Sequence, residues 1–146
     1  MEAFSSFFEQ LGKNAQKKYH YLLPDVLKIL PTVRQTDEED HITRALLSVV
    51  VLAEFAPKMF KDYFHDLVNF TIGVIQDRDL SDTVRQNGLE LMATFADNAP
   101  AMCRKDPGYT VNMVQQCLFL MTDVGVGDED ASAWNEAEDV GVAMQV

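Results

Sequence analysis

The sequence predicts an all-α protein in which antiparallel helix pairs stack one after another as a solenoid. The frame Ala-acid-x-Ala-Pro-x-Met occurs at 53–59 and again at 96–102, a displacement of 43 residues. Apolar residues recur at intervals of three and four on both sides of each Ala-Pro pair, which is the spacing of amphipathic helices. Because 47% of the 146 residues are hydrophobic, a chain the size of one ordinary domain can bury a core.

The first helix pair, within residues 1–33, is the least regular. Segments 2–12 and 19–33 carry apolar residues at helical spacing and are expected to fold back on each other. The polar stretch RQTDEED at 34–40 is expected to connect them to the next pair. Asp40 is the expected N-cap of the first helix of that next pair, because an Asp side chain accepts hydrogen bonds from the free amides at a helix start.

The second pair, within residues 41–77, is the clearest. A helix is predicted over 41–56, Pro57 ends it, and a second helix is predicted over 62–77. The residues expected in the core are Ile42, Ala45, Leu46, Val49, Leu52, Ala53 and Ala56 in the first helix, and Phe64, Leu67, Val68, Thr71, Val74 and Ile75 in the second.

The third pair, within residues 82–124, repeats this pattern with a longer turn. Ser81 is the expected N-cap of a helix over 82–99, and RKDPG at 104–108 lengthens the turn before a helix over 109–123. The residues expected in the core are Val84, Gly88, Leu89, Met92, Phe95, Ala96 and Ala99, and then Val111, Val114, Cys117, Leu118 and Met121.

The period and the connector between the last two pairs predict the type of repeat. A 43-residue unit of two helices lies in the range of roughly 40–47 residues of HEAT repeats. In the connector, Asp79 is expected to accept hydrogen bonds from helix-end amides, and Arg85 to bridge to acidic turns of neighbouring repeats. We therefore expect a HEAT-repeat α-solenoid of about three pairs, coiled as a right-handed superhelical segment. Without polar caps at its ends, it is expected to be a piece of a longer solenoid.

The charge is concentrated at the C-terminal end. The net charge is −11; residues 106–146 hold eight acidic residues and no Lys or Arg, and all twelve basic residues lie in 1–105. An acidic surface repels nucleic acid and anionic membranes and favours a basic protein partner. Residues 125–146 are expected to form a disordered acidic loop, in which the ligand candidates are Asp128, Glu129, Asp130, Trp134 and Asn135; the alternative is a loop whose Trp caps the last repeat.

The sequence offers no catalytic or cofactor motif. His20, His41 and His65 fall on separate elements, and Cys103 and Cys117 are fourteen residues apart, a spacing that matches no zinc pattern. No glycine-rich phosphate loop or nucleophile elbow occurs. We expect two reduced cysteines in the core, no enzyme, no metal and no cofactor.

Several stretches together resemble one family. These stretches are, in order, LLPDVLKILP, LAEFAPKMFKDYF, VIQDRDLSDTVRQNGLELM, FADNAPAMCRKDPGY and LMTDVGVGDEDASAWNEAEDVG. The most distinctive part is GDEDASAWNE at 127–136. Over about residues 19–140 the chain resembles the importin-beta superfamily (karyopherin-beta) of nuclear transport receptors, in its importin-five-like branch.

The resemblance implies a HEAT-repeat segment from the N-terminal half of a nuclear import receptor. Such a receptor shuttles between cytoplasm and nucleus and binds cargo and Phe-Gly nucleoporins during Ran-dependent transport. The first helix of each pair (A) would form the outer face and the second (B) the inner face. The implied partners are basic cargo, Phe-Gly nucleoporins and, in the full-length receptor, Ran-GTP, with neither nucleic acid nor membrane. The first repeats, which carry much of the Ran contact in the family, are absent from this sequence, so Ran binding is not carried over to this segment alone.

Two faces are candidate sites on this reading. Between the A helices, an apolar wall and a polar wall 43 residues later can hold a Phe side chain; the residues are Leu47, Val51, Phe55, Glu90, Thr94 and Asn98. Along the B helices, amides and a carboxylate can bind an extended basic peptide; the residues are Asp66, Asn69, Gln76, Asn112, Gln115 and Phe119. The alternatives are that the apolar stripe packs against neighbouring repeats and that the polar face is simply solvated.

Two other classes of protein share the helical pattern. One is a HEAT-repeat structural scaffold of the phosphatase or coat type, and the other is a self-contained helical regulatory domain. The acidic GDEDASAWNE loop favours the transport receptor, because a scaffold has no need of it.

Overall fold

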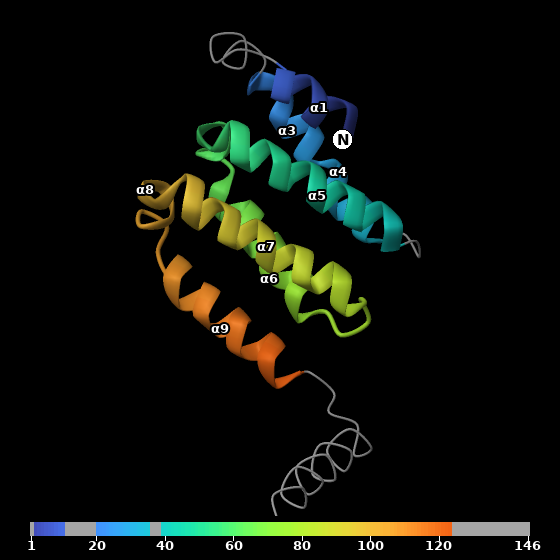
Figure 1. The fold of residues 1–146 in the computed structure, drawn as a ribbon, viewed down its shortest axis with the longest axis vertical. Coiled ribbons are helices and arrows are strands. Elements are labelled where there is room, and N and C mark those ends of the chain that lie inside the picture. The colour runs from blue at the N-terminus through green and yellow to red at the C-terminus, as the bar shows by residue number, and fades with distance from the viewer. Residues whose placement is uncertain (1, 11–19, 36–38, 124–146) are drawn as a thin grey trace, which may run out of the picture.

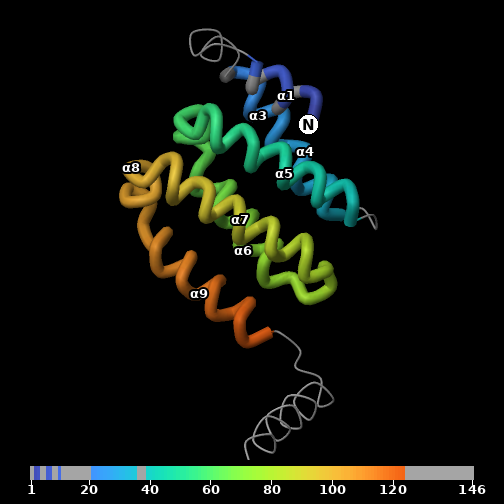
Figure 2. Tube along the Cα trace, viewed as in Figure 1, coloured from blue at the N-terminus to red at the C-terminus, as the bar shows by residue number. Residues whose placement is uncertain are grey.

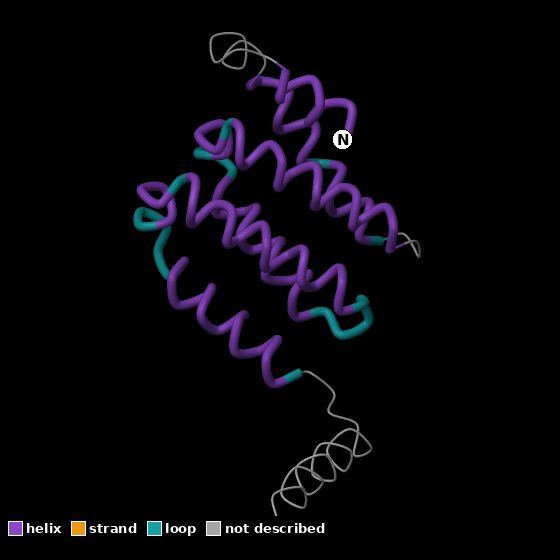
Figure 3. The backbone as a smooth tube through the Cα atoms, in the orientation of Figure 1, coloured by secondary structure: helices purple, strands orange, loops and turns teal. Residues whose placement is uncertain are grey.

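A computed structural model describes residues 2–10, 20–35 and 39–123 of the chain (Figure 1). Their regular elements are all helical (Figure 3). The first pair consists of α1 (Glu2–Gln10) followed by η1 (His20–Leu22), α3 (Leu23–Leu27) and α4 (Ile29–Arg34). The second pair consists of α5 (Glu39–Phe55), η2 (Pro57–Phe60) and α6 (Phe64–Gln76). The third pair consists of α7 (Asp82–Asn98), α8 (Pro100–Cys103) and α9 (Tyr109–Thr122).

The helices stack in the order of the chain, as the colour gradient in Figure 2 shows. The A helices α1, α5 and α7 contact one another in succession, α6 packs against α7 of the next pair, and α9 packs against both α6 and α7. This pattern of nearest-neighbour contacts is that of a helical-repeat solenoid. The predicted all-α solenoid is therefore confirmed.

The repeated Ala-Pro frame encodes the same turn twice. Ala56 and Ala99 leave the helical conformation at nearly the same backbone angles, φ −140° and ψ 52° against φ −137° and ψ 49°. A residue before proline is pushed out of the α region by the proline ring, so the A helix ends there. The following chain then begins a short helix with Pro57 or Pro100 in its first turn, where the missing N–H costs nothing.

The core lies mainly between the second and third pairs. All the residues predicted for the core in 41–56 and 62–77 are buried. Four aromatic rings join the pairs: Phe95 meets Phe60 and Phe64 edge-on at centroid distances of 5.1 Å, and Phe64 stacks on Tyr109 at 5.5 Å. Gly88 allows α6 and α7 to approach closely, because a Cβ there would lie 2.9 Å from Ile75 Cγ1.

The predicted stripe of α9 is wrong in phase. Its packed side carries Tyr109 and Gln116, which are buried, whereas four of the five residues predicted for the core are exposed and Cys117 is half-buried: Val111, Val114, Leu118 and Met121. The physical reason is that a solenoid helix has apolar residues on two sides, one for the preceding helices and one for whatever follows. Periodicity alone selected the side that no described residue covers.

The first pair and the helix ends also differ from prediction. The predicted helix 19–33 is broken at Lys28, because Pro31 cannot donate to Leu27 and its ring clashes with that carbonyl. Helix α5 begins at Glu39, so Asp40 lies inside the helix and is not its N-cap. Ser81 is the N-cap of α7, but its side chain makes no capping hydrogen bond.

Candidate binding surfaces

Charged side chains join successive helix pairs at the ends of the B helices. Arg34 Nη2 lies 2.8 Å from Asp77 Oδ2 and also donates to the Gly73 carbonyl at 3.2 Å. The hydrogen bond from Arg34 lowers the pKa of Asp77. The predicted role of Asp79 is wrong, since it is Asp77 that accepts, through Oδ1, from the Asp79 N–H at 3.2 Å. Asp77 therefore stabilises both the connector and the junction between the first two pairs.

The next junction uses Arg85, whose side chain is only 5% exposed. Its Nε donates to the Ile75 carbonyl at 2.9 Å, Nη1 to Asp82 at 3.2 Å and Nη2 to Asp123. Arg78 also pairs with Asp123, at 3.0 Å. Arg85 therefore reaches the preceding pair through the Ile75 carbonyl, whereas both of its acidic partners, Asp82 and Asp123, belong to its own pair. The predicted bridge to acidic turns of neighbouring repeats is thus wrong in its partners, and the burial of Arg85 places the contact in the core of the junction.

The candidate outer groove is partly accessible. Leu47 and Phe55 on α5 are 41% and 46% exposed, and Val51 between them is half-buried. On α7, Glu90 and Asn98 are exposed but Thr94 is buried at 9%. The Asn98 amide also donates to the Thr94 carbonyl of its own helix at 2.9 Å. The apolar wall can therefore meet a ligand, whereas the polar wall reduces to its two ends.

The candidate inner face divides between the two B helices. On α6, Asp66, Asn69 and Gln76 are all exposed, as is Gln115 on α9. Asn112 is half-buried. The half-buried Phe119 packs against the core and has two guanidinium carbons over its ring, that of Arg78 at 5.6 Å and that of Arg85 at 5.5 Å. This ring therefore supports the charged junction.

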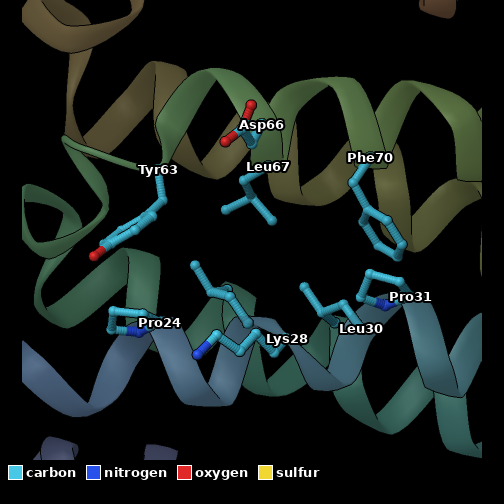
Figure 4. A pocket seen from close by; sticks show the side chains of 9 residues that line it. Pro24, Lys28, Leu30, Pro31, Tyr63, Asp66, Leu67 and Phe70 are labelled. Carbon is cyan, nitrogen blue, oxygen red and sulfur yellow. The ribbon is translucent and has the colours of Figure 1, made fainter.

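Sequence reasoning missed a groove on this inner side, between α3–α4 and α6 (Figure 4). Its volume is about 280 Å³ and its walls are mainly apolar. Asp66 and Lys28 carry its charges, and the lining residues are Pro24, Leu27, Lys28, Leu30, Pro31, Tyr63, Asp66, Leu67 and Phe70. Tyr63 and Phe70 stand three residues before and four residues after Asp66, so they share its side of the helix and not the buried stripe. This spacing is visible in the sequence and could have indicated the groove.

The described residues were also searched for metal sites and membrane-spanning helices. They contain no cluster of three or more His, Cys, Asp or Glu suited to a metal ion. Among these residues, no helix combines the length and the apolar character needed to cross a membrane. The acidic-loop candidates lie outside the described residues: Asp128, Glu129, Asp130, Trp134 and Asn135.

Comparison with known protein families shows to which family this chain belongs. A model of IPO5-like TPR repeats matches residues 1–70, and a model of the importin repeat matches residues 77–142. Importin subunit beta-3 of Saccharomyces cerevisiae is 38% identical over 137 residues, which cover 94% of this chain. This chain belongs to the importin-beta (karyopherin) family. Its 43-residue displacement is longer than the roughly 34 residues of a TPR unit and fits HEAT repeats.

Solved structures of the family have the same fold. Kap121p bound to Nup53p, Kap121p bound to Pho4p and Kap121p bound to RanGTP each match with a TM-score of 0.84 and 38% sequence identity over 90% of this chain. The chain spans about 13% of the length of these karyopherins and of the yeast importin. The HEAT-repeat solenoid predicted from the sequence is confirmed by these neighbours.

Proposed function

We propose that this chain is a segment of a nuclear import receptor that binds cargo and Phe-Gly nucleoporins during Ran-dependent transport. The main observation behind this proposal is the 38% identity to Kap121p over 90% of the chain, because structures of Kap121p have been solved in complex with Nup53p, Pho4p and RanGTP. The role is non-covalent binding, with no catalysis, and the receptor shuttles between cytoplasm and nucleus as members of its family do.

The outer face is suited to the nucleoporin contact. Leu47 and Phe55 are large apolar side chains left exposed on α5, with the half-buried Val51 between them. A Phe side chain laid on them removes apolar area from water, at about 25 cal/mol per Å². A single contact of this kind is weak, which suits a receptor that binds many Phe-Gly repeats at once and releases each quickly.

The inner face is suited to a basic extended segment. Asp66 is exposed at the edge of the groove between α3–α4 and α6, so a Lys of the ligand can pair with it while a neighbouring apolar side chain enters the groove. Asn69 and Gln76, farther along α6, supply side-chain amides that can hydrogen-bond the ligand backbone. The net charge of −11 favours approach of a basic partner.

The nucleoporin contact is tested by NMR titration of the labelled chain with a Phe-Gly repeat peptide. We expect shifts near Leu47, Val51 and Phe55 that a Ser-Gly peptide does not produce. Leu47→Ser is expected to weaken them, whereas Val114→Ser, a matched change at an exposed apolar residue of α9, is expected to leave them unchanged. Shifts that follow Val114 rather than Leu47 would remove the outer groove from the proposal.

The cargo contact is tested separately with a short peptide that alternates lysine and valine. Asp66→Asn is expected to weaken its binding several-fold, and Asp79→Asn, at an exposed residue in the connector, is expected to have little effect. Equal losses in the two variants would mean that the chain attracts the peptide by overall charge, without a site on α6.

A further inference from the structure

The described cations fall into two groups according to their partners. Outside one edge of the solenoid every described Lys or Arg forms an ion pair with a carboxylate: Lys28, Arg34, Arg44, Arg78 and Arg85. The cations that have no such partner within the described residues are Lys58, Lys61, Arg104 and Lys105. In a chain with a net charge of −11, a group of four cations without a carboxylate partner among the described residues calls for an explanation.

All four lie where the A helices turn into the B helices. Lys58 and Lys61 belong to or follow η2, and Arg104 and Lys105 follow α8. This is the left edge in Figure 1, where α5 and α7 end and α9 begins. Because the turns repeat, Lys61 and Arg104 occupy equivalent positions, 43 residues apart. The fold therefore brings cations of successive repeats to one edge.

Between the two turns is a hollow of about 400 Å³. Three of the four cations line it, together with the segment that ends α7 and begins α8, and none of the lining residues is a carboxylate: Lys58, Lys61, Asn98, Ala99, Pro100, Ala101, Met102 and Lys105. Asp62 and Asp97, the exposed acids next to this segment in sequence, do not line it. The hollow thus combines an apolar floor with an exclusively positive rim.

We propose that this hollow binds an acidic segment of a protein partner. An apolar side chain of that segment rests against Pro100 and Met102, and flanking carboxylates pair with the lysines of both turns. The charge of the ligand is opposite to that of the basic cargo proposed for the inner face, and the edge is a different surface, so this site does not depend on the transport role. A short acidic segment fits better than nucleic acid, because a polyanion that extends beyond the hollow meets a chain of net negative charge.

The test is an NMR titration of the whole chain with a blocked peptide in which glutamates flank a single leucine. We expect shifts at Lys61, Ala101 and Lys105, and weaker binding in added salt, since exposed ion pairs are screened. A peptide with serine in place of leucine is expected to bind more weakly, and one with lysine in place of glutamate is expected not to bind at this edge.

Charge-reversal variants locate the site. Lys61→Glu is expected to reduce affinity several-fold, from the loss of one exposed pair and the repulsion that replaces it. Lys28→Glu is the matched control, because it makes the same change of net charge on an exposed lysine that lines the inner groove and not this hollow. An equal loss in both variants, shifts that map elsewhere, or no shifts at all would overturn the proposal. So would a DNA duplex that displaces the peptide from Lys61 and Lys105.

Discussion

Replacing Arg85 by alanine removes a buried cation that ties the third helix pair to the second. The side chain is 5% exposed, donates to the Ile75 carbonyl at 2.9 Å and pairs with Asp82 and Asp123. An unsatisfied buried carbonyl costs about 1–3 kcal/mol. Removing one partner of a buried ion pair costs about 3–5 kcal/mol, but Asp123 keeps Arg78 at 3.0 Å and is itself partly exposed, so this part is smaller. We expect a total loss of about 2–4 kcal/mol in the free energy of unfolding.

The assay is urea unfolding followed by circular dichroism, with hydrogen exchange to locate the loss. Exchange protection is expected to fall first in α9, because solenoid stability is a sum over repeats and their interfaces. Arg78→Ala is the matched control: Arg78 also pairs with Asp123 and lies over Phe119, but its side chain is 69% exposed. An exposed pair contributes less than about 1 kcal/mol. Equal losses in the two variants would refute the argument that burial of Arg85 holds the junction.

Three further predictions follow from the same contacts. Gly88→Ala places a Cβ 2.9 Å from Ile75 Cγ1, so about 1–3 kcal/mol of overpacking outweighs about 1 kcal/mol of gained helix propensity; a variant more stable than the wild type in urea would contradict this. Ile75→Ala, at a fully buried side chain, is expected to lower the free energy of unfolding by about 2–5 kcal/mol. Leu118→Ala, 43 residues later and 56% exposed, is expected to lower it by less than about 0.5 kcal/mol. Similar losses in the two variants would mean that the exposed side of α9 is covered. The pKa of Asp77 is lowered below 3.8, so its contribution to stability is present above that pH and is lost as the pH falls through the folded-state pKa. In urea unfolding measured at a series of acidic pH values, Arg34→Gln is expected to make the free energy of unfolding fall less steeply with pH. Equal slopes for the variant and the wild type would contradict this.

The second pair could be predicted from the sequence almost completely because its neighbours are present on both sides. Both of its helices carry one continuous apolar stripe, and every residue of each stripe is buried. Here helical periodicity, the proline turn and the tertiary packing agree. The resemblance to karyopherins was likewise predictable, because it rests on motifs spread along the chain.

The sequence predictions fail where the apolar pattern of a helix does not determine which of its sides the neighbouring helices cover. In α9 an apolar stripe that includes Val114 and Leu118 satisfies the helical period better than the packed side, whose buried members include the polar Gln116. Period alone does not say which side of a helix its neighbours cover. The groove beside α6 was missed for a related reason, since it depends on how far α3–α4 stands from α6, and that distance has no counterpart in the sequence pattern.

The two edges of the solenoid use charge in different ways, and this links the fold to both proposals. At the edge where B helices end, Arg34 pairs with Asp77 of the next helix pair, and the buried Arg85 pairs with Asp123 of its own pair and donates to the Ile75 carbonyl of the preceding one. These side chains therefore hold the stack together. At the opposite edge the repeated Ala-Pro turns fix the backbone by proline geometry, and the contact between successive repeats there, His65 Nδ1 to Asp106 Oδ2 at 2.9 Å, uses no Lys or Arg. Cations at that edge, such as Lys61, therefore stay free to bind, and their replacement is expected to alter binding while leaving the stability of the stack unchanged.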